Sequence, residues 1–172
     1  MLRFLALGAV VLAGLALGQL YALQLQARYR DLESLRAGLR GLMTEIEYAK
    51  KPLPEAWKEL AGVYGGACSM VFDRASRLFG TDGHPTAGRA WRGALADCRG
   101  ELHLSREDAR IMDGLGAVLG KSGRADQVNH IRSMDERLAA QMEEARGQSA
   151  RRGRLSRSLG LLGGMLMAVI LA

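Results

Sequence analysis

Residues 29–50 read YRDLESLRAGLRGLMTEIEYAK, and this stretch has the clearest helical pattern in the sequence. Its large apolar side chains recur every three or four residues, the spacing that lines one face of an α-helix: Leu32, Leu35, Leu39, Leu42 and Ile46. Gly38 and Gly41 each weaken a helix by about 1 kcal/mol relative to alanine. We therefore expect an amphipathic helix that depends on packing against other helices for its stability.

The chain after this helix predicts further helices and no β-strand. Pro52, Leu53 and Pro54 end the first helix, and Pro54 suits the first turn of the next one. Turn-rich breaks separate the later expected helices, which cover residues 55–63, 67–78, 86–98, 105–119 and a long stretch after the break at 120–123.

Capping residues and apolar spacing support these helices. Thr86 is placed to cap one helix, and Ser105 with Asp108 resembles a capping box at the start of the next. The last helix has an apolar stripe made of Val128, Ile131, Met134, Leu138, Met142 and Ala145. We predict an all-α fold, an antiparallel bundle of about six helices, with a transmembrane helix at each end of the chain.

The predicted N-terminal anchor is residues 4–25, FLALGAVVLAGLALGQLYALQL, which contain no charged side chain. A helix of this length spans about 33 Å, enough for a hydrocarbon core of about 30 Å. The alternative is a cleaved signal peptide with Arg3 as its positive region. We favour a retained anchor, because the apolar run is long for a signal peptide and residues 16–18 form a poor cleavage site.

The predicted C-terminal anchor is residues 155–172, LSRSLGLLGGMLMAVILA. A helix here spans about 27 Å if the Arg157 side chain reaches the headgroups. The alternative is a tail that lies in the interface, but such a tail needs a polar face, and residues 159–172 have none.

Arginine placement predicts the topology of the chain. The basic residues that flank the apolar ends lie on the inner side of both: Arg28, Arg30, Arg151, Arg152, Arg154 and Arg157. By the positive-inside rule, the middle of the chain is cytoplasmic and both termini lie across the membrane. The expected domains are an anchor at 1–26, a helical domain at 27–154 and an anchor at 155–172.

Each predicted anchor also contains two glycines four residues apart. Gly14 and Gly18 lie in the first anchor, and Gly160 and Gly164 lie in the second. This spacing allows close packing between membrane helices. The alternative, which we favour, is that glycine is simply frequent in membrane helices and in this chain, which has 22.

Composition argues against several other classes of protein. The net charge of +6 comes from 24 Lys and Arg against 18 Asp and Glu. The basic excess gathers beside the apolar ends, which fits a membrane protein better than a nucleic-acid binder. Aromatic residues make up 5% of the chain, which disfavours an all-β fold. Cys68 and Cys98 are too few for a disulfide scaffold, and we expect free thiols.

No motif predicts catalysis or a cofactor. Residues 116–122, GAVLGKS, resemble a phosphate-binding loop, but only three residues separate the glycines and a helix precedes them, where a phosphate loop needs four residues and a strand. His84, His103 and His130 lack the spacing of metal ligands, and a structural hydrogen bond is the expected role of His130. One disfavoured alternative remains, a membrane-bound enzyme in which Glu45, Asp126 and His130 converge as an acid–base set.

Two segments of the sequence point to a known family. LRAGLRGLMTEIEYAKKPLPEAWKELA begins at Leu35, and GAVLGKSGRADQVNHI begins at Gly116. Together with the terminal apolar segments, they make the chain resemble the stage III sporulation protein AB family over its whole length. The positions that carry the resemblance are Glu45, Tyr48, Pro52, Leu53, Pro54, Gly120, Lys121, Ser122, Asp126, Gln127 and His130. Gly123 and Asn129 depart from the acidic residue and the lysine that we expect there.

The resemblance implies a role in the channel complex between mother cell and forespore. The helical domain of this family is similar to the F-type platform protein of type II secretion and type IV pilus systems. By this analogy, the protein lies in the mother-cell membrane and binds the AA-type ATPase and other stage III A subunits, but no cofactor and no nucleic acid. A scaffold or regulator without an ATPase contact is the alternative.

The surface that meets the ATPase is expected on the first and last helices of the middle domain. Polar residues there that should be exposed are Arg36, Arg40, Glu136 and Glu143. Charged helix faces are often simply solvated, so the competing interpretation is a surface without a partner.

Overall fold

The structure is a computed structural model of the chain. It describes the backbone of residues 2–49, 51–121 and 123–171, and the side chains of residues 16, 19–20, 23–48, 51–121 and 123–147. The chain divides into two compact units, one formed by residues 28–143 and the other by residues 1–27 together with 144–172.

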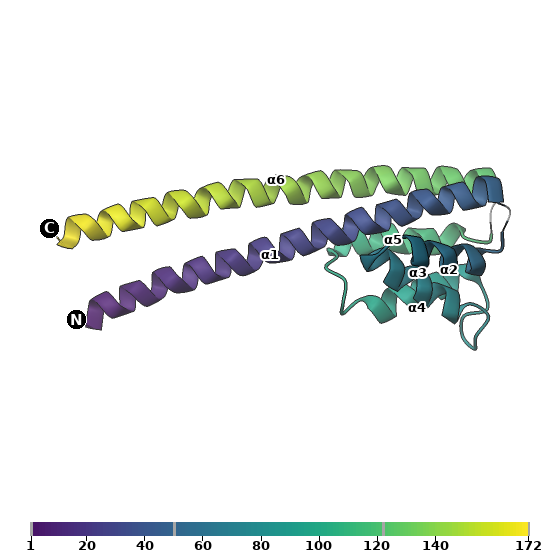
Figure 1. Cartoon of the computed structure of the whole chain (residues 1–172), viewed down its shortest axis with the longest axis horizontal. Helices are drawn as coiled ribbons and strands as arrows, with labels where there is room; N and C mark the ends of the chain where they lie inside the picture. Colours follow the sequence, from purple (N-terminus) through teal and green to yellow (C-terminus); the bar gives the residue numbers. More distant parts are fainter. Residues whose placement is uncertain (1, 50, 122, 172) are drawn as a thin grey trace. The chain divides into compact units, whose positions relative to one another are not determined.

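The fold is all-α, as predicted (Figure 1). Throughout the described backbone there are six α-helices and no strand: α1 (Leu2–Thr44), α2 (Leu53–Val63), α3 (Gly66–Leu78), α4 (Ala87–Cys98), α5 (Arg106–Val118) and α6 (Arg124–Leu171). A π-helical turn, Glu45–Ala49, extends α1. Helices α1 and α6 are longer than the helices expected for the bundle, because the backbone of each continues as a helix into the residues of a predicted anchor.

Most side chains of the predicted N-terminal anchor, and all side chains of the predicted C-terminal anchor, lie outside the described residues. The same holds for Gly14, Gly18, Gly160 and Gly164, whose surroundings the structure does not describe. In the part of the chain that is described, no helix combines the length and the apolar character that crossing a membrane requires.

The core of the 28–143 unit contains the apolar stripes expected from the sequence. Leu32, Leu35, Leu39 and Leu42 of α1 are fully buried, and so are Ile131 and Leu138 of α6. These side chains pack with aromatic residues of the shorter helices in one cluster. Within this cluster the rings of Phe72 and Trp91 meet edge to face, with their centroids 5.3 Å apart.

The helix starts follow the predicted caps. The Thr86 hydroxyl accepts a hydrogen bond from the backbone N–H of Arg89 at the start of α4. Ser105 and Asp108 form the reciprocal bonds of a capping box at the start of α5. Helix α2 begins slightly earlier than expected, at Leu53, with Pro52 as its N-cap and Pro54 in its first turn.

The two cysteines are free, as expected, and the structure buries both of them. Burial raises the pKa of the Cys68 thiol to about 12. The space beside this thiol explains Gly38, because a methyl group on Gly38 would collide with the Sγ of Cys68 and lie 2.9 Å from the ring of Phe72. Close packing of α1 against α3 therefore offsets the helix propensity that glycine loses.

Candidate functional site

The positions that carry the family resemblance lie in two segments at one end of the 28–143 unit, where α1 ends and α6 begins (Figure 1). Glu45 and Tyr48 lie in the π-helical turn, and Pro52, Leu53 and Pro54 begin α2. Gly120 and Lys121 follow α5, and Asp126, Gln127 and His130 lie in the first turns of α6. Ser122 lies outside the described residues.

In the first segment, the proline residues hold the backbone and an aromatic side chain is left exposed. The carbonyl oxygen of Pro52 accepts N–H bonds from Glu55 and Ala56, both at 3.1 Å. The carbonyl oxygen of Pro54 accepts a hydrogen bond from the Ser76 hydroxyl at 2.9 Å. Tyr48 is 73% exposed, so its ring is not part of the core.

The second segment combines a helix stop with a helix start. Gly120 has a φ of 72°, the left-handed conformation that commonly ends helices. Lys121 and Asp126 are exposed, whereas Gln127 is buried. The Nε2 of His130 is buried and has no hydrogen-bond partner among the described residues, so this nitrogen does not make the expected structural bond.

The disfavoured alternative, an acid–base set, is not assembled by any contact among the described residues. No hydrogen bond or ion pair joins the described side chains of Glu45, Asp126 and His130 to one another. Glu45 and His130 are half-buried and Asp126 is exposed. Among the described side chains, no group of three His, Cys, Asp or Glu residues is arranged to hold a metal.

The resemblance to a phosphate-binding loop has a packing explanation. Gly116 lies within α5, where its backbone meets that of Gly88 in α4. A methyl group on Gly116 would lie 2.8 Å from the carbonyl oxygen of Gly88. The first glycine of the motif therefore allows two helices to approach closely, which agrees with the rejection of a phosphate loop.

The predicted partner surface divides into exposed and engaged residues. Glu136, Glu143 and Arg40 are exposed. Arg36 was expected to be exposed, but its side chain is only 18% exposed. Its Nε lies 2.7 Å from an Asp135 oxygen. Arg40 pairs with the other oxygen of Asp135 at 3.0 Å, so both arginines join α1 to α6.

A second contact from α1, centred on Arg28, was not anticipated from the sequence. Its guanidinium donates to both oxygens of Asp108 at 2.7 and 2.8 Å, and to the Gln141 side-chain oxygen at 2.9 Å. Arg28 thus joins α1, α5 and α6, in addition to flanking the predicted anchor. We call Arg28, Asp108, Gln141, Arg36 and Asp135 the α1 arginine network.

Burial and hydrogen bonding act in opposite directions on the acids of this network. Burial alone would raise the pKa of Asp108, yet hydrogen bonds from Arg28 and Ser105 outweigh it and hold that pKa below its ordinary value. The same balance holds for Asp135, where burial opposes and hydrogen bonds from Arg36 and Arg40 lower the pKa. Both carboxylates are therefore charged at neutral pH.

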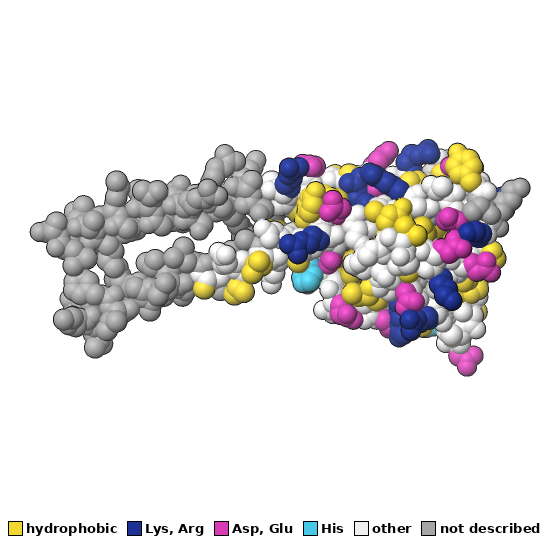
Figure 2. Space-filling view, viewed as in Figure 1, with side chains coloured by type: hydrophobic (Ala, Val, Ile, Leu, Met, Phe, Trp, Pro, Cys, Tyr) yellow, Lys and Arg dark blue, Asp and Glu magenta, His cyan; other side chains and the backbone are white. Residues whose placement is uncertain are grey.

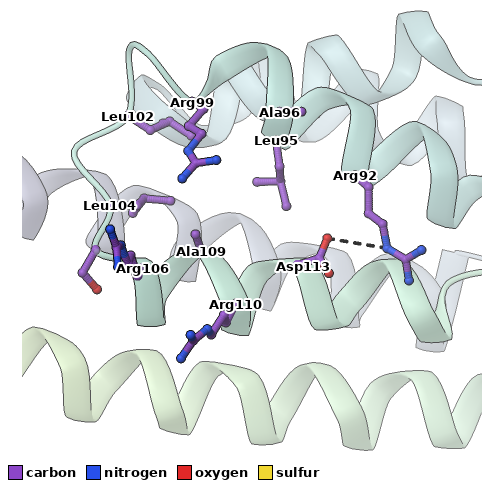
Figure 3. A pocket seen from close by; sticks show the side chains of 11 residues that line it. Arg92, Leu95, Ala96, Arg99, Leu102, Leu104, Arg106, Ala109, Arg110 and Asp113 are labelled. Atoms are coloured by element: carbon purple, nitrogen blue, oxygen red, sulfur yellow. Dashed lines mark ion pairs between the residues drawn. The ribbon is translucent and has the colours of Figure 1, made fainter.

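A groove between α4 and α5 in the 28–143 unit was also not anticipated (Figure 3). Its cavity volume is about 470 Å³. Leu95, Leu102 and Leu104 form an apolar floor, and arginines lie along the rim. We call this site the α4–α5 groove.

The face of the 28–143 unit in Figure 2 carries basic and acidic side chains interspersed with one another. On this face, the described side chains form no single basic stripe of the kind that a nucleic-acid groove reader presents.

The fold and these contacts define an all-helical protein whose described side chains form the α1 arginine network and line the α4–α5 groove. The chain belongs to the stage III sporulation protein AB family, whose sequence profile matches residues 3–172. The stage III sporulation protein AB of Bacillus subtilis (strain 168) is 29% identical over 144 residues, covering 84% of each chain. A solved structure of a stage III sporulation protein AB superposes with a TM-score of 0.66 at 27% identity, covering 72% of this chain and 97% of the other.

Proposed function

We propose that the protein is a non-enzymatic membrane platform subunit of the channel complex between mother cell and forespore. Membership of the stage III sporulation protein AB family carries this proposal. The family description makes the chain a sporulation protein. The platform role goes further than the family description. It means that the protein binds a cytoplasmic AA-type ATPase and the other stage III A membrane subunits.

The apolar ends of the chain support the membrane part of the proposal. Residues 4–25 contain no charged side chain, and arginines flank both ends on their inner sides. Under this proposal both segments cross the bilayer of the mother cell, with residues 27–154 in the cytoplasm and both termini on the opposite side. Resistance of the full-length protein to extraction by alkaline carbonate tests the anchors, and complete release into the soluble fraction would contradict them.

The α1 and α6 surface supports the ATPase part of the proposal. Glu136 and Glu143 are exposed on α6, and Arg40 is 58% exposed on α1. Arg36 contributes through Asp135, which it holds in position beside Arg40. Exposed charges of both signs can steer and orient a protein partner without contributing much to stability.

The experiment is co-purification of the full-length protein with the AA-type ATPase, with ATP and with ADP. Charge reversal by Glu136→Lys with Glu143→Lys should weaken binding about tenfold. A matched control reverses two exposed acids in loops, Asp82→Lys with Glu101→Lys, and should leave binding unchanged. Absence of binding to the unaltered protein with either nucleotide would refute the ATPase contact, and equal losses in both variants would exclude this surface.

A further inference from the structure

The charged rim of the α4–α5 groove differs from one end to the other. Arg99 and Arg106 lie at the end where the loop joins α4 to α5, next to Leu102 and Leu104 (Figure 3). Arg92 and Asp113 lie towards the other end and form an ion pair of 3.5 Å. The loop end is therefore basic, and the opposite end is close to neutral.

The two arginines at the loop end have no acidic partner within the described structure. Both side chains are exposed, and no described carboxylate lies within salt-bridge distance of either one. The nearby acid Glu107 is engaged elsewhere, by Arg110 at 3.4 Å and by Arg137 at 3.5 Å. A ligand with carboxylates can therefore pair with Arg99 and Arg106 without breaking an existing ion pair.

The floor of the groove is apolar and therefore favours a ligand with an apolar face. Leu95, Leu102 and Leu104 are half-buried and pack against the core from one side. Their remaining apolar surface faces the cavity, beside alanines of α4 and α5. Covering it removes apolar area from water, which favours association.

We propose that the α4–α5 groove binds an acidic amphipathic helix of a partner protein. The apolar face of that helix lies on Leu95, Leu102 and Leu104, and its carboxylates at one end meet Arg99 and Arg106. This surface differs from the α1 and α6 residues proposed to bind the ATPase. A negative result for the groove therefore leaves the ATPase proposal unaffected, and the reverse also holds.

The combination of charge and apolar surface favours a helix over a single anion or a lipid headgroup. Arg92 is already paired with Asp113, so the cations open to a ligand are Arg99 and Arg106 at the loop end. A phosphate alone would pair with these two arginines and leave the apolar surface of Leu95, Leu102 and Leu104 in water, whereas an acidic amphipathic helix covers that surface as well. A second copy of this chain, whose net charge is +6, is a poor match for a basic rim.

The test measures fluorescence anisotropy of a labelled synthetic peptide with the full-length protein in a non-ionic detergent. The peptide is an amphipathic helix of about 14 residues with leucines on one face and glutamates on the other. We expect saturable binding that Arg99→Glu with Arg106→Glu weakens about tenfold or more. Arg99→Gln with Arg106→Gln should weaken it less, and replacing the leucines of the peptide with serine should abolish it.

The matched control reverses two exposed basic residues outside the groove, Lys58→Glu with Arg124→Glu, and should leave the affinity within about twofold. The proposal is overturned if the peptide does not bind saturably, or if both double variants weaken binding equally. It is also overturned if the peptide dissociates a dimer of this chain in sedimentation velocity, which indicates a second copy as the occupant. A different result is that the protein binds phosphatidylglycerol vesicles with an affinity that depends on Arg99 and Arg106, while its binding to the peptide does not depend on them. That result would assign the groove to lipid instead.

Discussion

The α1 arginine network and the α4–α5 groove both contain arginines paired with acids, but the two sets of ion pairs differ in burial. In the network, the Arg28 side chain is 13% exposed and faces Asp108, whose side chain is fully buried. In the groove, the side chains of Arg92 and Asp113 are 46% and 59% exposed and 3.5 Å apart. We therefore expect burial, rather than the presence of an ion pair, to decide how much each arginine stabilises the fold.

The energies of the two regions should differ for the same reason. A buried carboxylate that loses its cation must stay charged without a partner or take up a proton, and either outcome is costly. An exposed pair that breaks is replaced by water at a small cost. Substitutions in the network should therefore destabilise the protein more than equivalent substitutions in the groove.

Arg28→Ala should lower the free energy of unfolding by about 3–5 kcal/mol, because it leaves Asp108 buried without its cation. The matched control, Arg92→Ala, should cost about 1 kcal/mol or less. Urea unfolding monitored by circular dichroism measures both. Equal losses in the two variants would show that burial does not separate the network from the groove.

Gly116→Ala should lower the free energy of unfolding by about 1–3 kcal/mol, the usual cost of excess volume in a packed interior. The new methyl group would lie 2.8 Å from the Gly88 carbonyl oxygen and 2.9 Å from the Cγ of Arg92. Gly62→Ala is the control, because nothing lies within 4 Å of a methyl group there. A destabilisation at position 116 but not at position 62 would show that the close approach of α4 and α5 requires glycine at position 116.

Acid should destabilise the protein through the α1 arginine network. The folded pKa values of Asp108 and Asp135 lie below their ordinary value of 3.8, so the unfolded chain binds protons first as the pH falls. Their contribution is complete above the ordinary pKa and is lost as the pH falls through the folded pKa. Urea unfolding between about pH 6 and pH 3 should show this decline. Asp135→Asn should make the decline shallower, and an unchanged slope would remove Asp135 as a contributor.

Local patterns were enough to predict most of the fold. The three- and four-residue spacing of Leu32, Leu35, Leu39 and Leu42 predicted a buried face, and all four side chains are fully buried. The caps at Thr86 and Ser105 were predicted because their hydrogen bonds reach only three residues along the chain. The lengths of α1 and α6 were harder to predict, because a change from one apolar pattern to another does not by itself end a helix.

Contacts between distant residues could not be predicted in the same way. Arg28 and Asp108 are 80 positions apart, and nothing near Arg28 in the sequence distinguishes it from a basic residue beside an anchor. The contact between Gly88 and Gly116 and the α4–α5 groove likewise depend on how two helices pack. The family resemblance identified positions such as Tyr48 and His130, but the exposure of one and the buried Nε2 of the other required the structure.

The loop end of the groove should contribute least to stability. Arg99→Ala with Arg106→Ala should change the free energy of unfolding by no more than about 0.5 kcal/mol, because both side chains are exposed and pair with no described carboxylate. Urea unfolding measures it against the unaltered protein. A loss comparable to that of Arg28→Ala would make these arginines part of the fold. Stability that stays constant while peptide affinity falls would instead assign them to binding, since the fold would then gain nothing from keeping two such cations beside an apolar groove.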